Sequence, residues 1–455
     1  AITLIAAACG GDDDDTTATE APAATEAPEP DTTEAPEPDT TEAPEPDTTD
    51  APEPDTTDAP EPDGDGDGDA VAFGALLPES GSLAAIVESL RVPIDLAAEE
   101  INEAGGVLGS PLEIIGADDG TDDATIASTS FERLVTSDGV DVVLGPASST
   151  LAEGLMSEFA ASDIVVCNGS NTSAALQQLD DNGRYFQFAP NDNLQGPALA
   201  EVISSDGHGS VAILVRNDTY GTGFGDAIEA ALLDLGIDVP FNEAYDPEAD
   251  SFTAQAEQIR SGIEAGDFEA VVVIGFSSDG GQVIADMIES GVGPADIPIY
   301  TGDGMQGSSF WEQVGSDPSL VEGIKGTAPA AAPAGIEHPF QERFAETGVD
   351  TIFSSYYYDC AITMALAIES AGSTDVEAII QGAFDVTSGD TECQGFAECK
   401  ELLDAGESIN VSGASGSLAL DEGGAVLDGA YDVWAYNADG EPAGLDEPQI
   451  MLSLA

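Results

Sequence analysis

From Ala70 onward, short apolar runs alternate with helical patterns, and this alternation limits the possible folds more than any other feature of the chain. The runs expected to form strands are 71–77, 111–119, 140–146 and 163–169, followed by SVAILVRND, EAVVVIGF and IPIYTGD between 210 and 303. Helices are expected at 90–106, 124–137 and 150–161. Parallel sheets with crossover helices are built this way, so the chain is assigned to the α/β class. The loop-like segment 189–197 breaks the alternation, which favours two α/β sets in tandem over one barrel.

The charge of the chain is strongly one-sided. Its 455 residues include 89 acids and 8 bases, giving a formal net charge of −81 at pH 7. A surface this negative repels phosphates, which excludes nucleic acids and anionic lipid headgroups as partners. Two interpretations remain open: a solvated acidic coat suited to salty surroundings, or a field that concentrates cationic or zwitterionic solutes.

The first residues, AITLIAAACGG, are typical of the end of a signal sequence, and eight apolar residues cannot span a bilayer. Small residues precede Cys9 and Gly10 follows it, a pattern similar to the bacterial lipobox, although Ala6 stands where Leu is more common. Residues 1–8 are therefore expected to be a signal remnant and Cys9 the point of lipid attachment, which anchors the protein to the cell membrane. The alternative is that Cys9 is a stray thiol.

An acidic, Pro-rich repeat fills the chain from Thr32 to Asp63, where the unit T-T-E/D-A-P-E-P-D recurs before an Asp-Gly run. Proline favours extended polyproline II structure, and neighbouring acids repel each other. No apolar residue larger than Ala is available for burial. Residues 9–69 are therefore expected to form a disordered stalk.

Polar and aromatic residues follow several of the expected strands. In open α/β sheets ligands bind beyond the carboxyl ends of the strands, so these residues are the candidates for a binding site. Hydroxyl groups suit a carboxylate, acids suit an ammonium group, and aromatic rings can stack on a ligand. The candidates are Ser149, Ser170 and Thr172 for a carboxylate, Asp192 and Asp303 for an ammonium group, and Tyr220 and Phe276 for stacking. The structural alternatives are helix caps, turn residues and core-edge packing.

Histidine and cysteine usage argues against an enzyme. The two histidines, His208 and His338, have no nucleophile or metal ligand at motif spacing, and no phosphate-binding loop is present, so neither a metal nor a cofactor is expected. Cys393 and Cys399 lie in one short segment and are expected to form a disulfide in an extracellular compartment. Cys167 and Cys360 lie in apolar segments and are expected to be buried free thiols, with a bridge between them as the alternative.

From about Ala70 onward the chain resembles the Leu/Ile/Val-binding family of periplasmic-type receptors for ABC transporters. The motifs that carry the resemblance are DLAAEEINEAGGVLGSPLEI (95–114), LGPASST, NGSNT, QGP (195–197), NDTYGTGF (217–224) and FSSDGGQ (276–282). The resemblance implies a type I periplasmic-binding-protein fold with two Rossmann-like lobes and three hinge crossings, near 190, near 327 and after about 410. Lobe 1 would comprise 70–190 and 327–410, and lobe 2 would comprise 191–326 and 411–455.

The same resemblance assigns the seven candidates the roles given above. Two departures concern the side-chain pocket: Ile86 stands where better-known amino-acid binders carry an aromatic residue, and the disulfide they form between the first two strand-end loops has no cysteines here.

The resulting functional hypothesis is a monomeric, extracytoplasmic receptor that captures a small amino acid or related solute by lobe closure and delivers it to an ABC permease. The alternatives are a ligand sensor for a membrane signalling receptor, a binder of a non-zwitterionic solute such as an amide, urea or organic acid, and a structural surface protein without a ligand.

Overall fold

The computed structural model describes residues 70–445 and 447–454. The expected signal remnant, Cys9 and the stalk lie outside the described residues. The description that follows concerns the unit formed from Gly64 onward.

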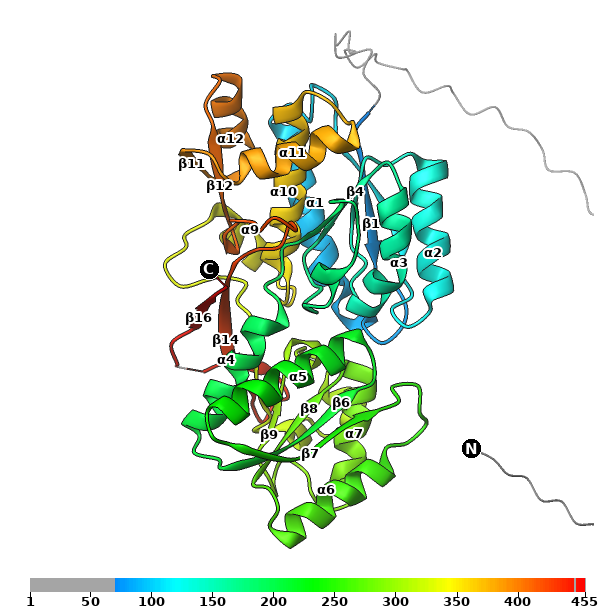
Figure 1. The fold of residues 1–455 in the computed structure, drawn as a ribbon, viewed down its shortest axis with the longest axis vertical. Helices are drawn as coiled ribbons and strands as arrows, with labels where there is room; N and C mark the ends of the chain where they lie inside the picture. The colour runs from blue at the N-terminus through cyan, green and yellow to red at the C-terminus, as the bar shows by residue number, and fades with distance from the viewer. Residues whose placement is uncertain (1–69, 446, 455) are drawn as a thin grey trace, which may run out of the picture. The chain divides into compact units, whose positions relative to one another are not determined.

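The first sheet has five parallel strands in the order β2-β1-β3-β4-β5. Its strands are β1 (Ala72–Leu77), β2 (Glu113–Asp118), β3 (Val142–Leu144), β4 (Val165–Asn168) and β5 (Tyr185–Gln187). Helices α1 (Val87–Glu103) and α10 (Ser354–Ala371) cover one face, and α2 (Ala124–Arg133) and α3 (Ser149–Ala161) cover the other (Figure 1). Because both faces are covered, every residue of β1, β3 and β4 is buried, and all of them are apolar or glycine except Asn168 at the end of β4.

The second sheet has eight strands, with a parallel part ordered β10-β9-β8-β6-β7. At its other edge β14 runs antiparallel to β10 and pairs with both β15 and β16. The strands are β6 (Ser210–Arg216), β7 (Asp238–Tyr245), β8 (Ala270–Ile274), β9 (Ile299–Thr301), β10 (Lys325–Pro329), β14 (Asp428–Tyr436), β15 (Pro442–Gly444) and β16 (Ile450–Ser453). The α-helices within this part of the chain are α4 (Asp192–Ser205), α5 (Thr219–Asp234), α6 (Thr253–Ala265), α7 (Ser277–Glu289) and α8 (Trp311–Val314).

A third, three-stranded sheet lies beside helices that pack on the first sheet (Figure 1). It consists of β11 (Thr391–Cys393), β12 (Ile409–Gly413) and β13 (Gly416–Ser417), and the neighbouring helices are α9 (Pro339–Ala345), α11 (Val376–Val386) and α12 (Gly395–Asp404). Single turns of other helix types occur at 84–86, 134–138, 176–178, 303–305 and 318–321. Of the helices in the described ranges, none combines the length and apolar character needed to cross a membrane.

The expected α/β class with two sheets in tandem is confirmed, but two local expectations were wrong. The segment 189–197 is not wholly a loop, because α4 begins at Asp192, where the Asn191 side chain accepts the Asn193 N–H at 3.0 Å and caps the helix. The helix expected over 124–137 ends as a regular α-helix at Arg133 and continues as one wider π turn to Asp138.

Two disulfides are present in the described chain. Cys393 and Cys399 are joined across one short segment. Cys167 at the end of β4 is bonded to Cys360 in α10, across a sequence separation of 193 residues. The expectation of two free thiols at Cys167 and Cys360 was therefore wrong. Both lie in apolar segments because the bridge is itself buried between the sheet and the helix.

Candidate functional site

A small cavity lies among the loops that follow the strands of both sheets. It is lined by Leu83, Ile86, Ala147, Ser149, Ser170, Tyr220, Phe276, Asp303, Gly304 and Phe353. Five of the seven predicted ligand-binding residues are among them: Ser149, Ser170, Tyr220, Phe276 and Asp303. The space open to the centre of a water molecule is only about 20 Å³, so the lobes must move apart before a solute can enter.

The topology explains why residues so distant in sequence meet here. Ser149 and Ser170 follow β3 and β4 of the first sheet, whereas Tyr220, Phe276 and Asp303 follow β6, β8 and β9 of the second. Parallel strands present their carboxyl ends at one edge of a sheet, and the two edges face the same cavity.

Asp303 supplies the cavity with a buried carboxyl group that is 5% exposed. Its Oδ1 accepts hydrogen bonds from Gln195 Nε2 at 2.8 Å and from the Tyr220 hydroxyl at 3.1 Å. Burial raises the pKa of Asp303 to about 6, and these donors oppose the shift because they stabilise the charged form. The group is thus a buried acid held in a fixed orientation, which suits a cationic partner.

Tyr220 and Phe276 stack on each other, with ring centroids 5.4 Å apart and an interplanar angle of 16°. The guanidinium of Arg216 lies on the Phe276 ring, 3.6 Å from its centroid. Gly304, next to Asp303, donates its N–H to the Tyr220 hydroxyl at 3.3 Å. The aromatic pair therefore forms a braced wall of the cavity.

Ser149 is the first residue of α3, a helix whose N-cap residue, Ser148, makes no side-chain capping bond. The Ser149 hydroxyl oxygen accepts the Ser173 N–H at 3.4 Å, which leaves its own proton available. An uncapped helix start carries free N–H groups and a partial positive charge. This side of the cavity can bind an anionic group such as a carboxylate.

Ser170 also lines the cavity, but its hydroxyl already has partners. It donates to the Ala147 carbonyl at 3.0 Å and lies 3.0 Å from the Tyr357 hydroxyl. The backbone N–H groups of Ser170 and Asn171 both donate to Asn168 Oδ1. In this conformation Ser170 therefore shapes the cavity wall and has no free proton for a carboxylate.

Thr172 and Asp192 are not among the lining residues. The Asp192 N–H donates to the Thr172 carbonyl at 2.7 Å, and both residues are 1% exposed. Neither carboxylate oxygen of Asp192 has a hydrogen-bond partner among the described residues. Burial, followed by the nearby Asp303 charge, raises the pKa of Asp192 well above its usual value. Asp192 thus lies behind the cavity, where the charge of Asp303 disfavours its ionisation.

Five apolar or small lining residues were absent from the predicted site: Leu83, Ile86, Ala147, Gly304 and Phe353. The sequence marks Ile86 only as a departure from the family pattern. Phe353 adopts a left-handed backbone conformation with φ 58° immediately before α10, and no local sequence signal marks it as a cavity residue. The left-handed backbone conformation costs energy for a bulky residue, so the packing around Phe353 must hold it there.

The loop after β2 supports the floor of the cavity. Asp119 is fully buried, and its carboxylate accepts the N–H of Thr121 and the N–H of Ala147, both at 2.8 Å. Burial raises the pKa of Asp119 to about 7. Asp119 therefore positions Ala147, and with it the start of the loop that carries Ser149.

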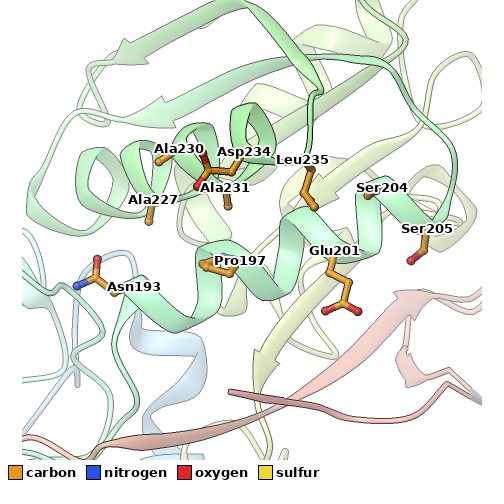
Figure 2. Close-up of a pocket in the computed structure, with 10 residues that line it drawn as sticks. All are labelled: Asn193, Pro197, Glu201, Ser204, Ser205, Ala227, Ala230, Ala231, Asp234 and Leu235. Carbon is orange, nitrogen blue, oxygen red and sulfur yellow. The ribbon is translucent and has the colours of Figure 1, made fainter. Parts of the chain in front are cut away.

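A wider groove of about 680 Å³ lies between α4 and α5 (Figure 2). Figure 2 shows Pro197 and Glu201 of α4 and three alanines, Ala227, Ala230 and Ala231, of α5 along it. Its polar groups are side chains at an open surface, and no buried group of the kind found at Asp303 lines it. The smaller cavity is therefore the better candidate site.

Two α/β lobes whose strand-end loops surround one cavity define a two-lobed solute-binding architecture. A family model described as periplasmic binding protein matches residues 70–396, and the chain belongs to this family.

Individual relatives support this assignment. The chain is 25% identical over 370 residues to the chemotactic signal transduction system substrate-binding protein BasB of Halobacterium salinarum, covering 78% of this chain and 84% of that protein. It is 23% identical over 381 residues to Leu/Ile/Val-binding protein homolog 3 of Brucella melitensis, covering 83% and 94%. The fold matches the branched-chain amino acid transporter substrate-binding protein LivJ of Streptococcus pneumoniae in complex with isoleucine, with a TM-score of 0.67, 20% identity and coverage of 85% and 100%. The resemblance to Leu/Ile/Val-binding proteins is thus confirmed.

Proposed function

We propose that the protein is an extracytoplasmic receptor that captures a small amino acid between its lobes and delivers it to an ABC importer. One observation carries the proposal: a buried acid from the second sheet, Asp303, and an uncapped helix start with a free hydroxyl proton from the first sheet, at Ser149, line one cavity. These two sides complement the ammonium and carboxylate groups of a zwitterion.

The rest of the lining suits an apolar side chain. Leu83, Ile86 and Phe353 contribute hydrocarbon surface, and the stacked Tyr220–Phe276 pair adds aromatic surface. Asp303 is the proposed ammonium partner, and the buried Asp192 lies behind it, outside the cavity lining. Thr172 and Ser170 maintain the loop geometry, and Ser149 with the start of α3 receives the carboxylate. Binding proceeds without turnover of the solute.

Lobe closure follows from how the chain crosses between the sheets. It leaves the first sheet after β5, returns after β10, and enters the second sheet again at β14. Because β10 ends at Pro329 and β13 at Ser417, the expected bounds at 327 and 410 shift, and we assign 70–190 and 330–417 to lobe 1, and 191–329 and 428–454 to lobe 2. The receptor acts as a monomer held at the membrane by a lipid on Cys9. Mass spectrometry of the membrane fraction tests the anchor, since Cys9→Ser should release the protein.

Calorimetry with the twenty standard amino acids tests the site. A small set of apolar amino acids should bind with a dissociation constant near the micromolar range, about −8 kcal/mol. Asp303→Asn keeps the shape of the side chain and removes its charge, so it should abolish most of this affinity while the fold, read by circular dichroism, is retained. Binding of amides, urea or organic acids alone would overturn the zwitterion proposal.

A second candidate function uses the same cavity for sensing. Its support is the chemotactic signal transduction relative, with which this chain aligns over 370 residues. Two results would favour sensing over transport. The solute-loaded protein would bind a membrane signalling receptor, and deletion of its gene would leave uptake of the solute unchanged.

A further inference from the structure

Arg216 at the end of β6 lies directly behind the cavity wall. Its guanidinium is 3.6 Å from the centre of the Phe276 ring, and Phe276 lines the cavity. Its side chain is only 3% exposed. Within its own lobe it pairs with Asp218 at 2.7 Å and with Asp279 at 2.9 Å. Arg216 therefore already has two anionic partners that hold it against Phe276.

A third partner of Arg216 comes from the other lobe. Arg216 Nη2 lies 3.2 Å from Oδ1 of Asp122, in the loop that follows β2 of the first sheet. The second oxygen of Asp122 accepts the Ser82 N–H at 3.0 Å. Ser82 directly precedes Leu83, which lines the cavity from the first-sheet part of the chain, whereas Tyr220 and Phe276 line it from the second-sheet part. The Asp122 carboxylate thus links the segment that carries Leu83 to Arg216, the cation that lies behind Phe276.

Further polar contacts between the lobes surround Thr219. Its N–H donates to Thr150 Oγ1 at 3.2 Å, its carbonyl accepts from Ser173 Oγ at 3.2 Å, and its hydroxyl donates to Glu153. These contacts brace the rim near α3. These contacts do not involve Arg216. The Arg216–Asp122 contact differs from them because its cation stacks on Phe276.

We propose that Asp122 and Arg216 are positioning residues for solute capture: their ion pair forms when the lobes close and holds the Leu83 side and the Phe276 side of the cavity together. The proposal rests on the proposed function because it assigns these residues a role in retaining the captured solute. Neither residue touches the solute. They act through Phe276 and through the loop that carries Leu83.

Asp122→Asn tests the contact without endangering the fold. Arg216 keeps Asp218 and Asp279, so no buried cation is left unpaired. Asp122 is 37% exposed and its amide analogue still accepts the Ser82 N–H. Because the pair is partly exposed, its loss should weaken binding by about two- to fivefold. The loss should appear in the dissociation rate, since the pair forms only in the closed state.

The matched control is Asp138→Asn, which removes the charge from another Arg–Asp pair, Arg133–Asp138 at 2.7 Å, inside one lobe. With L-leucine as the probe in stopped-flow measurements, Asp122→Asn should dissociate two- to fivefold faster than both the wild type and Asp138→Asn, with an unchanged association rate. The difference should shrink at 1 M salt, where charges are screened beyond about 3 Å. In an Arg216→Lys background, Asp122→Asn should add less than in the wild type, because the planar fork that joins Asp122 to Phe276 is lost.

Small-angle X-ray scattering gives a readout that needs no solute. Solute-free Asp122→Asn should have a larger radius of gyration than the wild type and Asp138→Asn, because its lobes close less often. If no standard amino acid binds the wild type, the proposed function fails and the scattering comparison alone decides on the ion pair. Equal dissociation rates, or, without a binding probe, equal radii of gyration for Asp122→Asn and Asp138→Asn, would overturn the inference.

Discussion

The hydroxyl of Tyr220 donates a hydrogen bond to Asp303 across 3.1 Å, although the two residues follow different strands and lie 83 positions apart. The contact orients the acid proposed to receive the ammonium group. It also places an aromatic ring and a carboxylate in one rigid unit of the second lobe.

Tyr220→Phe should weaken amino-acid binding at pH 7 by about three- to tenfold. The ring still stacks on Phe276, but Asp303 loses a donor that stabilises its charged form, so its pKa rises further. Calorimetry measures the change. Tyr356→Phe is the control, because the Tyr356 hydroxyl donates to the Ala330 carbonyl and does not contact the cavity. Equal losses in both variants would contradict the assigned role.

Binding of an amino acid should depend on pH through Asp303, whose pKa is raised to about 6 by burial. The charged form is the one that attracts an ammonium group, so affinity should fall as pH drops through 6. From pH 7 to pH 5 the dissociation constant should rise about tenfold. Titration calorimetry at constant ionic strength measures it, and a flat profile between pH 5 and 7 would rule out Asp303 as the ammonium partner.

Asp119 should make the solute-free protein less stable as pH rises. Its pKa in the folded chain is about 7, above its usual 3.8, so between these values the folded state binds a proton that the unfolded state has released. The free energy of unfolding therefore falls as pH rises through this window. Asp119→Asn should flatten the slope of urea-unfolding free energy against pH between 4 and 7. An unchanged slope would show that Asp119 does not bind this proton.

The two disulfides should differ in their effect on stability. Removing the Cys167–Cys360 bridge frees a loop of 193 residues, whereas removing Cys393–Cys399 frees a loop of 6. The chain-entropy model gives about 5 kcal/mol for the long loop and about 2 kcal/mol for the short one. Thermal unfolding of the two double-alanine variants compares them. A larger loss for the short loop would show that local packing outweighs loop entropy.

Much of the fold was predictable because its strands are locally distinct. β1, β3, β4, β6 and β8 are short apolar runs between turn residues, and each lies within an expected segment. β14 was not anticipated, because its place beside β10 depends on pairing between segments about 100 residues apart. Local periodicity contains no information about such a partner.

The candidate site divides in a similar way. Ser149 and Asp303 could be found from their positions after strands. The sequence could not show that the Ser170 hydroxyl is already hydrogen-bonded, because its partner Tyr357 lies 187 residues further along the chain. Phe353 was missed because it directly precedes α10, a helix whose packing against the first sheet is a tertiary feature. Asp192 is buried outside the cavity lining, and the residue type alone does not predict whether an aspartate is buried.

The position of β14 determines when the second sheet can be completed during synthesis. This strand inserts between β10 and β15 and is contributed by residues 428–436. A chain emerging vectorially from a ribosome or a translocation pore lacks this strand until those residues have appeared. Until then the edge of β10 has no antiparallel neighbour, and such an open edge invites pairing with other chains. The second sheet is therefore completed only after most of the described chain has been synthesised, and the edge of β10 is covered only from that point.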